Sequence, residues 1–97
     1  MTELLFLVSS ATTGAVLIPL ASACGRNGTS WCCFVTGEGV KQLKDAEVLK
    51  QLPNAERVIA CEHSWHEFFG SSECPVELGS QTSNSEMMTE TQRVISL

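Results

Sequence analysis

The sequence predicts a three-layer α/β domain, in which helices cover both faces of a mostly parallel sheet. Three observations predict this fold. Short apolar runs alternate with segments of helical spacing, and short glycine-containing turns connect them. In addition, 97 residues with 43% hydrophobic content can bury roughly two-thirds of their unfolded surface around one core but cannot support two. We therefore expect a single domain over residues 1–97.

The first strand is predicted at residues 4–8, an apolar run whose length fits a strand buried on both faces. Residues 9–14 have the small polar composition of a loop. Residues 15–24 then predict a helix that ends at Gly25 or Gly28, although Pro19 would kink a helix at an interior position.

The second strand is predicted at residues 29–35, which are rich in aromatic and β-favouring residues and are followed by Thr36-Gly37-Glu38-Gly39. Apolar residues at helical spacing follow, and they predict one helix over residues 40–52. This helix should end before Pro53, because the residue before a proline avoids helical geometry.

The third strand is predicted at residues 57–61 and should end at about Cys61, where the chain becomes polar. Trp65, Phe68 and Phe69 then form an apolar helical stripe that stops at Gly70, and a loop over residues 71–75 follows. The mostly polar residues 80–92 predict a helix with few apolar anchors. Residues 93–97 resemble a final strand.

The charge balance disfavours two classes of partner. Eleven Asp and Glu face six Lys and Arg, so the chain would repel phosphate backbones and anionic membrane surfaces. The basic residues are also scattered, and no stretch combines them with aromatic residues that could stack on bases. We therefore expect neither nucleic acid nor membrane as a partner.

The cysteine pattern favours a reducing compartment. The count of five is odd, and adjacent Cys32 and Cys33 would point to opposite faces of a strand, which makes a poor disulfide framework. The apolar stretch that ends at Cys24 has some features of a bacterial lipoprotein signal. However, Glu3 stands where such a signal carries Lys or Arg, and residues 9–14 interrupt the apolar region. We expect a cytoplasmic protein without a signal or membrane span.

Cys61 is the main candidate for chemistry. Ligands and reactive groups of open parallel sheets collect beyond the carboxyl ends of the strands, and Cys61 is expected there, beside the start of a helix. Free N–H groups and peptide dipoles at a helix start favour a thiolate. His63 and His66 are close enough in sequence to assist by charge or proton transfer, whereas Glu62 would oppose the thiolate. The alternative is a buried cysteine followed by surface histidines.

Zinc binding is a second interpretation of the same region, because Cys61, His63, His66 and Cys74 are donors that suit zinc. Their spacing argues against it, since Cys74 stands alone whereas zinc modules pair their donors at both ends. Gly37 and Gly39 lack the third glycine of a phosphate-binding loop, and they indicate a turn. Trp31 and Trp65 are expected to be packing residues rather than a ligand platform.

The order of these segments resembles the DsrE/DsrF-like family, small α/β domains that include subunits of bacterial sulfur-relay complexes. The resemblance rests on residues 4–14, a strand followed by a glycine-containing turn, and on residues 33–40, a strand that ends in a Gly-Val turn. It also rests on Val58-Ile59-Ala60-Cys61 and on the short helix that closes at Gly70.

The resemblance implies a flavodoxin-like fold that uses no flavin, and therefore no cofactor. It implies that Cys61 carries sulfur as a persulfide, and that the partners are other sulfur-carrier proteins in homo- or hetero-oligomers. The chain would then be a sulfurtransferase or persulfide carrier. The alternative is a non-catalytic subunit or regulatory binding module with the same fold, and an inert Cys61 would favour that alternative.

Overall fold

A five-stranded, all-parallel sheet forms the middle layer of the computed structural model, which describes residues 1–97. The strands lie in the order β4-β3-β2-β1-β5. In chain order the elements are β1 (Thr2–Val8), α1 (Gly14–Asn27), β2 (Trp31–Val35), the 3-10 helix η1 (Gly37–Lys44), α2 (Ala46–Gln51), the 3-10 helix η2 (Leu52–Asn54), β3 (Arg57–Cys61), α3 (Glu62–Phe69), β4 (Glu77–Gly79), α4 (Gln81–Thr89) and β5 (Thr91–Ser96).

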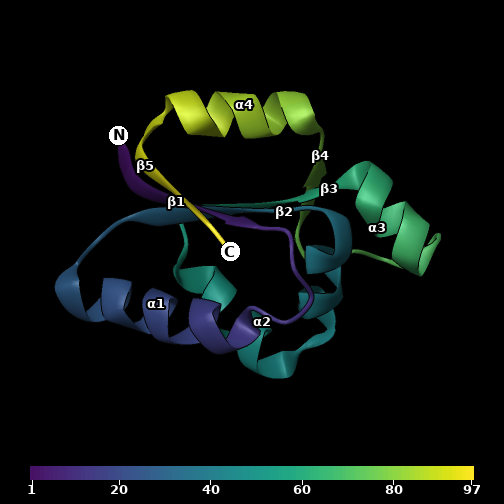
Figure 1. The fold of residues 1–97 in the computed structure, drawn as a ribbon, viewed down its shortest axis with the longest axis horizontal. Coiled ribbons are helices and arrows are strands. Elements are labelled where there is room, and N and C mark those ends of the chain that lie inside the picture. Colours follow the sequence, from purple (N-terminus) through teal and green to yellow (C-terminus); the bar gives the residue numbers. More distant parts are fainter.

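Helices cover both faces of this sheet, so the predicted three-layer α/β fold is confirmed. Helices α1 and α2 lie on one face and α4 lies on the other (Figure 1). The chain steps from β1 to β4 in one direction across the sheet and then returns to place β5 beside β1. Because crossovers between parallel strands are right-handed, this reversal puts α4 on the opposite face from α1 and α2.

Each face of the sheet has its own core. The larger core cluster contains 14 buried residues and joins alternate strand residues to α1, η1, α2 and α3. The smaller core cluster has six buried members: Leu5, Cys32, Phe34, Ile59, Cys61 and Met87. Met87 is the only member from a helix, so α4 anchors this face through one buried side chain. Trp31 and Trp65 are both buried in the larger cluster, as predicted for packing residues.

Two predictions about the elements are wrong. Residues 40–52 do not form one helix, because Asp45 adopts an extended conformation and separates η1 from α2. The Asp45 side chain accepts a hydrogen bond from the backbone N–H of Glu47 at 2.9 Å, and so caps α2. The second error is at Thr91 and Gln92, which were predicted to end a helix and which begin β5. Strand β4 was not predicted, and it extends the sheet beyond β3.

Helix α1 contains Pro19 in its interior, where the sequence predicted a kink or a later start. The helix nevertheless runs from Gly14 to Asn27 and ends at Gly28, whose φ of 66° is left-handed and suits glycine. Every helix of the protein is too short or too polar to cross a membrane.

Candidate active site

Cys61 lies at the junction between β3 and α3. It is the last residue of the strand and also the residue that precedes the first turn of the helix. Residues alternate between the two core clusters along β3, with Ala60 in the larger cluster and Cys61 in the smaller. The Cys61 side chain therefore points toward the α4 face, and the residue is 7% exposed.

The Cys61 thiol has a lowered pKa despite its burial. Burial raises the pKa, but polar hydrogens near the sulfur outweigh that effect and bring the pKa below its ordinary value. These hydrogens belong to the Ser64 hydroxyl and backbone N–H, the Thr36 hydroxyl and the His63 backbone N–H. Two of these donors are backbone groups in the first turn of α3, where N–H groups have no helical partner. The site therefore favours a thiolate.

Buried Ser64 is held so that its hydroxyl can donate to this sulfur. The Ser64 Oγ accepts a hydrogen bond from the backbone N–H of Gly37 at 2.9 Å. Because the oxygen already serves as an acceptor there, its own hydrogen is free for Cys61. Thr36 lies 3.5 Å from Ser64, measured between the hydroxyl oxygens. The turn after β2 thus supports the end of β3.

A shallow pocket of about 430 Å³ opens onto the sulfur. Its walls come from the ends of β3 and β4, the first half of α3 and the start of α4. They consist of Cys61, Glu62, His63, His66, Gly79, Ser80 and Gln81. The pocket gives a reactant access to Cys61 although most of the side chain is covered.

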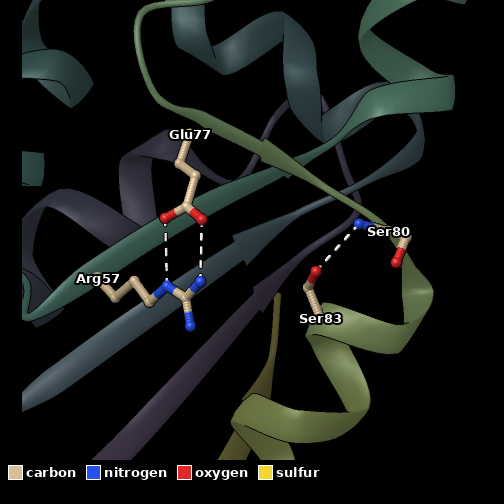
Figure 2. A network of polar contacts seen from close by, with 4 residues as sticks. All are labelled: Arg57, Glu77, Ser80 and Ser83. Atoms are coloured by element: carbon tan, nitrogen blue, oxygen red, sulfur yellow. Dashed lines mark hydrogen bonds and ion pairs between the residues drawn. The ribbon is translucent and has the colours of Figure 1, made fainter.

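Strand β4 and helix α4 form the second wall of this pocket. Arg57 of β3 and Glu77 of β4 make a two-pronged ion pair, with nitrogen–oxygen distances of 3.2 and 2.9 Å, across the two strands (Figure 2). Ser80 begins α4 with a capping box, in which its backbone N–H donates to the Ser83 hydroxyl (Figure 2). A Cβ on Gly79 would come within 2.6 Å of the Ile59 side chain, so only glycine permits this close turn.

Gln81, in the first turn of α4, reaches back to the thiol. Its Nε2 donates a long hydrogen bond to the Cys61 Sγ at 4.0 Å and another to the Thr36 Oγ1 at 3.4 Å. An amide nitrogen carries two hydrogens, so both contacts can form together.

The other cysteines lack this environment. Burial raises the pKa of Cys33 to about 12 and that of Cys32 to about 11. Burial also raises the pKa values of Cys24 and Cys74. All five thiols are free. Cys74 packs against the larger core cluster, on the other side of the sheet from Cys61.

Both predicted histidines line the pocket, although neither imidazole is hydrogen-bonded to the Cys61 sulfur. His63 contributes its backbone N–H, and its exposed ring lies in the pocket wall. The His66 Nδ1 lies 2.8 Å from the Gly70 carbonyl oxygen, at the far end of α3. The zinc interpretation receives no support, because no three His, Cys, Asp or Glu side chains gather in a way that could hold a metal ion.

Sequence reasoning missed two site residues. Ser64 is three residues after the residue that precedes the helix, a position from which a side chain commonly reaches back to that residue, and this spacing could have revealed it. Gln81 had no such signal, because it reaches Cys61 only through the return of the chain along β4. Residues 9–14 do not line this pocket, and Gln42 holds that loop through Ser10 and Thr13.

Comparison with known proteins identifies no relative. No protein-family model matches the chain, and no curated protein matches it.

Proposed function

We propose that this protein is a sulfur-relay carrier, in which Cys61 accepts sulfane sulfur as a persulfide and passes it to a partner thiol. The observation that carries the proposal is the position of the Cys61 thiol at the end of β3, where it opens into a pocket, lies 4.0 Å from the Gln81 amide nitrogen and has a pKa that nearby polar groups lower. Sulfur transfer needs a thiolate that is accessible and stable as both nucleophile and leaving group. The resemblance to the DsrE/DsrF-like family, carried by residues 58–61 among others, supports the same chemistry.

The proposed reaction has two balanced steps. In the first, the Cys61 thiolate attacks the outer sulfur of a donor persulfide, the donor S–S bond breaks, and the donor leaves as a thiolate. The proton stays with the transferred sulfur, so the product is Cys61–S–SH. In the second step an acceptor thiolate attacks that outer sulfur, and Cys61 leaves as a thiolate. The donors from Ser64, Thr36 and His63 stabilise the Cys61 thiolate before the first step and after the second.

The proposal includes a setting and partners. Five free thiols suit a reducing cytoplasm. Other sulfur-carrier proteins would be donor and acceptor, and the resemblance implies assembly into homo- or hetero-oligomers. His63 and His66 line the approach to the sulfur and would assist the reaction by charge or proton transfer.

Mass spectrometry after incubation with glutathione persulfide and thiol blocking tests the proposal. Native protein should gain one sulfur atom that maps to Cys61, and Cys61→Ser should not gain it. Cys74→Ser is the matched control and should gain sulfur as native protein does. If native protein takes up no sulfur, or if all five cysteines are labelled equally, the carrier proposal is wrong and the non-catalytic binding module is the better account.

A further inference from the structure

The position of a second sulfur atom on Cys61 is constrained by the donors around the first. The hydroxyls of Ser64 and Thr36 and the N–H groups of the α3 first turn approach the Cys61 sulfur from β2 and α3. A persulfide adds an atom about 2 Å beyond that sulfur. The remaining free direction is the pocket between the first turns of α3 and α4.

Gln81 is the one pocket side chain with a polar atom already in contact with the Cys61 sulfur. Its Nε2 lies 4.0 Å from the Sγ, which is long for a bond to that atom. An added sulfur in the pocket would extend into the space that Gln81 lines. The bond from Nε2 to the Thr36 Oγ1, at 3.4 Å, keeps the amide directed toward this position.

The groups that lower the pKa of Cys61 lie on a different side of the sulfur from Gln81. They come from Ser64, Thr36 and His63. The Gln81 amide approaches the sulfur from the opposite wall of the pocket, at 4.0 Å. An N–H donor in that position suits an anion that forms only after sulfur has been loaded.

We propose that Gln81 is a sulfur-binding residue of the carrier: once the Cys61 persulfide has released its proton to solvent, the Gln81 amide binds the anionic outer sulfur and retains it in the pocket. This inference rests on the proposed function. A bound persulfide anion resists nucleophiles, because an attacking group meets negative charge on the outer sulfur. A protonated persulfide lacks that protection. Gln81 therefore sets how long the sulfur stays on the carrier between donor and acceptor.

The test measures how fast loaded protein loses its outer sulfur to cyanide. Cyanide attacks that sulfur, thiocyanate forms, and Cys61 leaves as a thiolate, so thiocyanate reports the loss. After loading with glutathione persulfide and removal of excess donor, Gln81→Ala should lose sulfur about tenfold faster than native protein, the effect of one hydrogen bond to a charged group. Gln81→Glu keeps the size of the side chain and favours the helix start. Because it lacks the amide donor, it should lose sulfur at least as fast as Gln81→Ala.

Two controls separate the possible causes. Gln92→Ala removes an exposed glutamine on β5 and should match native protein. Alkylation of unloaded Cys61 should have the same pH profile in Gln81→Ala as in native protein. A general disturbance of the site would change that profile. Equal rates of sulfur loss in native protein, Gln81→Ala and Gln81→Glu would overturn the role of Gln81 and leave the carrier function intact. Failure of native protein to load would overturn both.

Discussion

On one face of the sheet 14 buried residues pack beneath α1, α2 and α3, whereas on the other six pack beneath α4 alone. Cysteines in the interior of a strand and at its end behave differently, since burial also raises the pKa of Cys32, which shares the smaller cluster with Cys61. Cys33 belongs to the larger cluster, and burial raises its pKa to about 12. Cys61 belongs to the smaller cluster, at the end of its strand, where hydrogen-bond donors lower its pKa. Burial alone therefore makes a thiol inert, and the end of a strand supplies the polar hydrogens that reverse this effect.

The largest expected effect is on the face that carries the larger core cluster. Trp65 is fully buried there, and its Nε1 donates a hydrogen bond to the Ser72 carbonyl at 2.8 Å. Trp65→Ala should lower the free energy of unfolding by about 4 kcal/mol, because it leaves a cavity and an unpaired carbonyl. Urea denaturation measures this change. A loss below about 1 kcal/mol would be typical of a surface substitution, and it would show that α3 contributes little to the core.

On the face that carries the smaller core cluster, one methionine anchors α4 to the sheet. Met87 is 3% exposed and is the only helix residue in the smaller core cluster. Met87→Ala should lower the free energy of unfolding by about 2 kcal/mol, at the lower end for such truncations. It should also speed alkylation of Cys61, because α4 would open more often. Met88→Ala is the matched control, since Met88 is 42% exposed, and it should change neither quantity. Equal effects in the two variants would contradict the assigned anchor.

The next prediction concerns the donors that distinguish Cys61 from Cys33. Ser64→Ala removes the Ser64 hydroxyl but keeps the backbone N–H, so the pKa of Cys61 should rise toward its ordinary value. Alkylation of Cys61 at pH 7 should become about tenfold slower, because less of the thiol is ionised. Ser96→Ala, at an exposed position of β5, is a control of the same chemistry and should leave the rate unchanged. An unchanged rate in Ser64→Ala would mean that the helix N–H groups alone maintain the thiolate.

The smallest expected effect concerns the exposed pair that joins β3 to β4. Glu77→Gln should lower the free energy of unfolding by less than about 1 kcal/mol, because exposed ion pairs contribute little. High salt should reduce the difference between variant and native protein. Denaturation at low and high salt checks this prediction. A larger loss that salt does not alter would indicate that β4 depends on this pair for its place in the sheet.

Much of the fold was predictable, because it depends on local patterns. The apolar run of β3 ends at Cys61 as predicted, and Gly70 follows α3 as predicted. Strand β4 was not predictable, since its three residues lie at the sheet edge and are mostly exposed, so they form no apolar run. The break at Asp45 had a local signal, because aspartate favours the position before a helix.

The candidate site divides in the same way. Cys61 could be selected from the sequence, since a cysteine that ends an apolar run before a helix is recognisable. The roles expected for the imidazoles of His63 and His66 remain predictions. Gln81 could not be found, because its contact with Cys61 joins residues 20 apart through a strand that the sequence did not reveal. Tertiary return of the chain, rather than local spacing, completes the pocket.

The most direct test of the central claim is the pH dependence of alkylation at Cys61 and Cys74 in the same native sample, followed by peptide mass spectrometry. The two thiols make a strict comparison, because Cys74 is the more exposed, yet its pKa is raised while that of Cys61 is lowered. Only the thiolate reacts, so Cys61 should be labelled at lower pH than Cys74 despite its burial. Labelling of Cys74 first as the pH rises would show that exposure governs reactivity, and it would contradict an activated thiolate at Cys61.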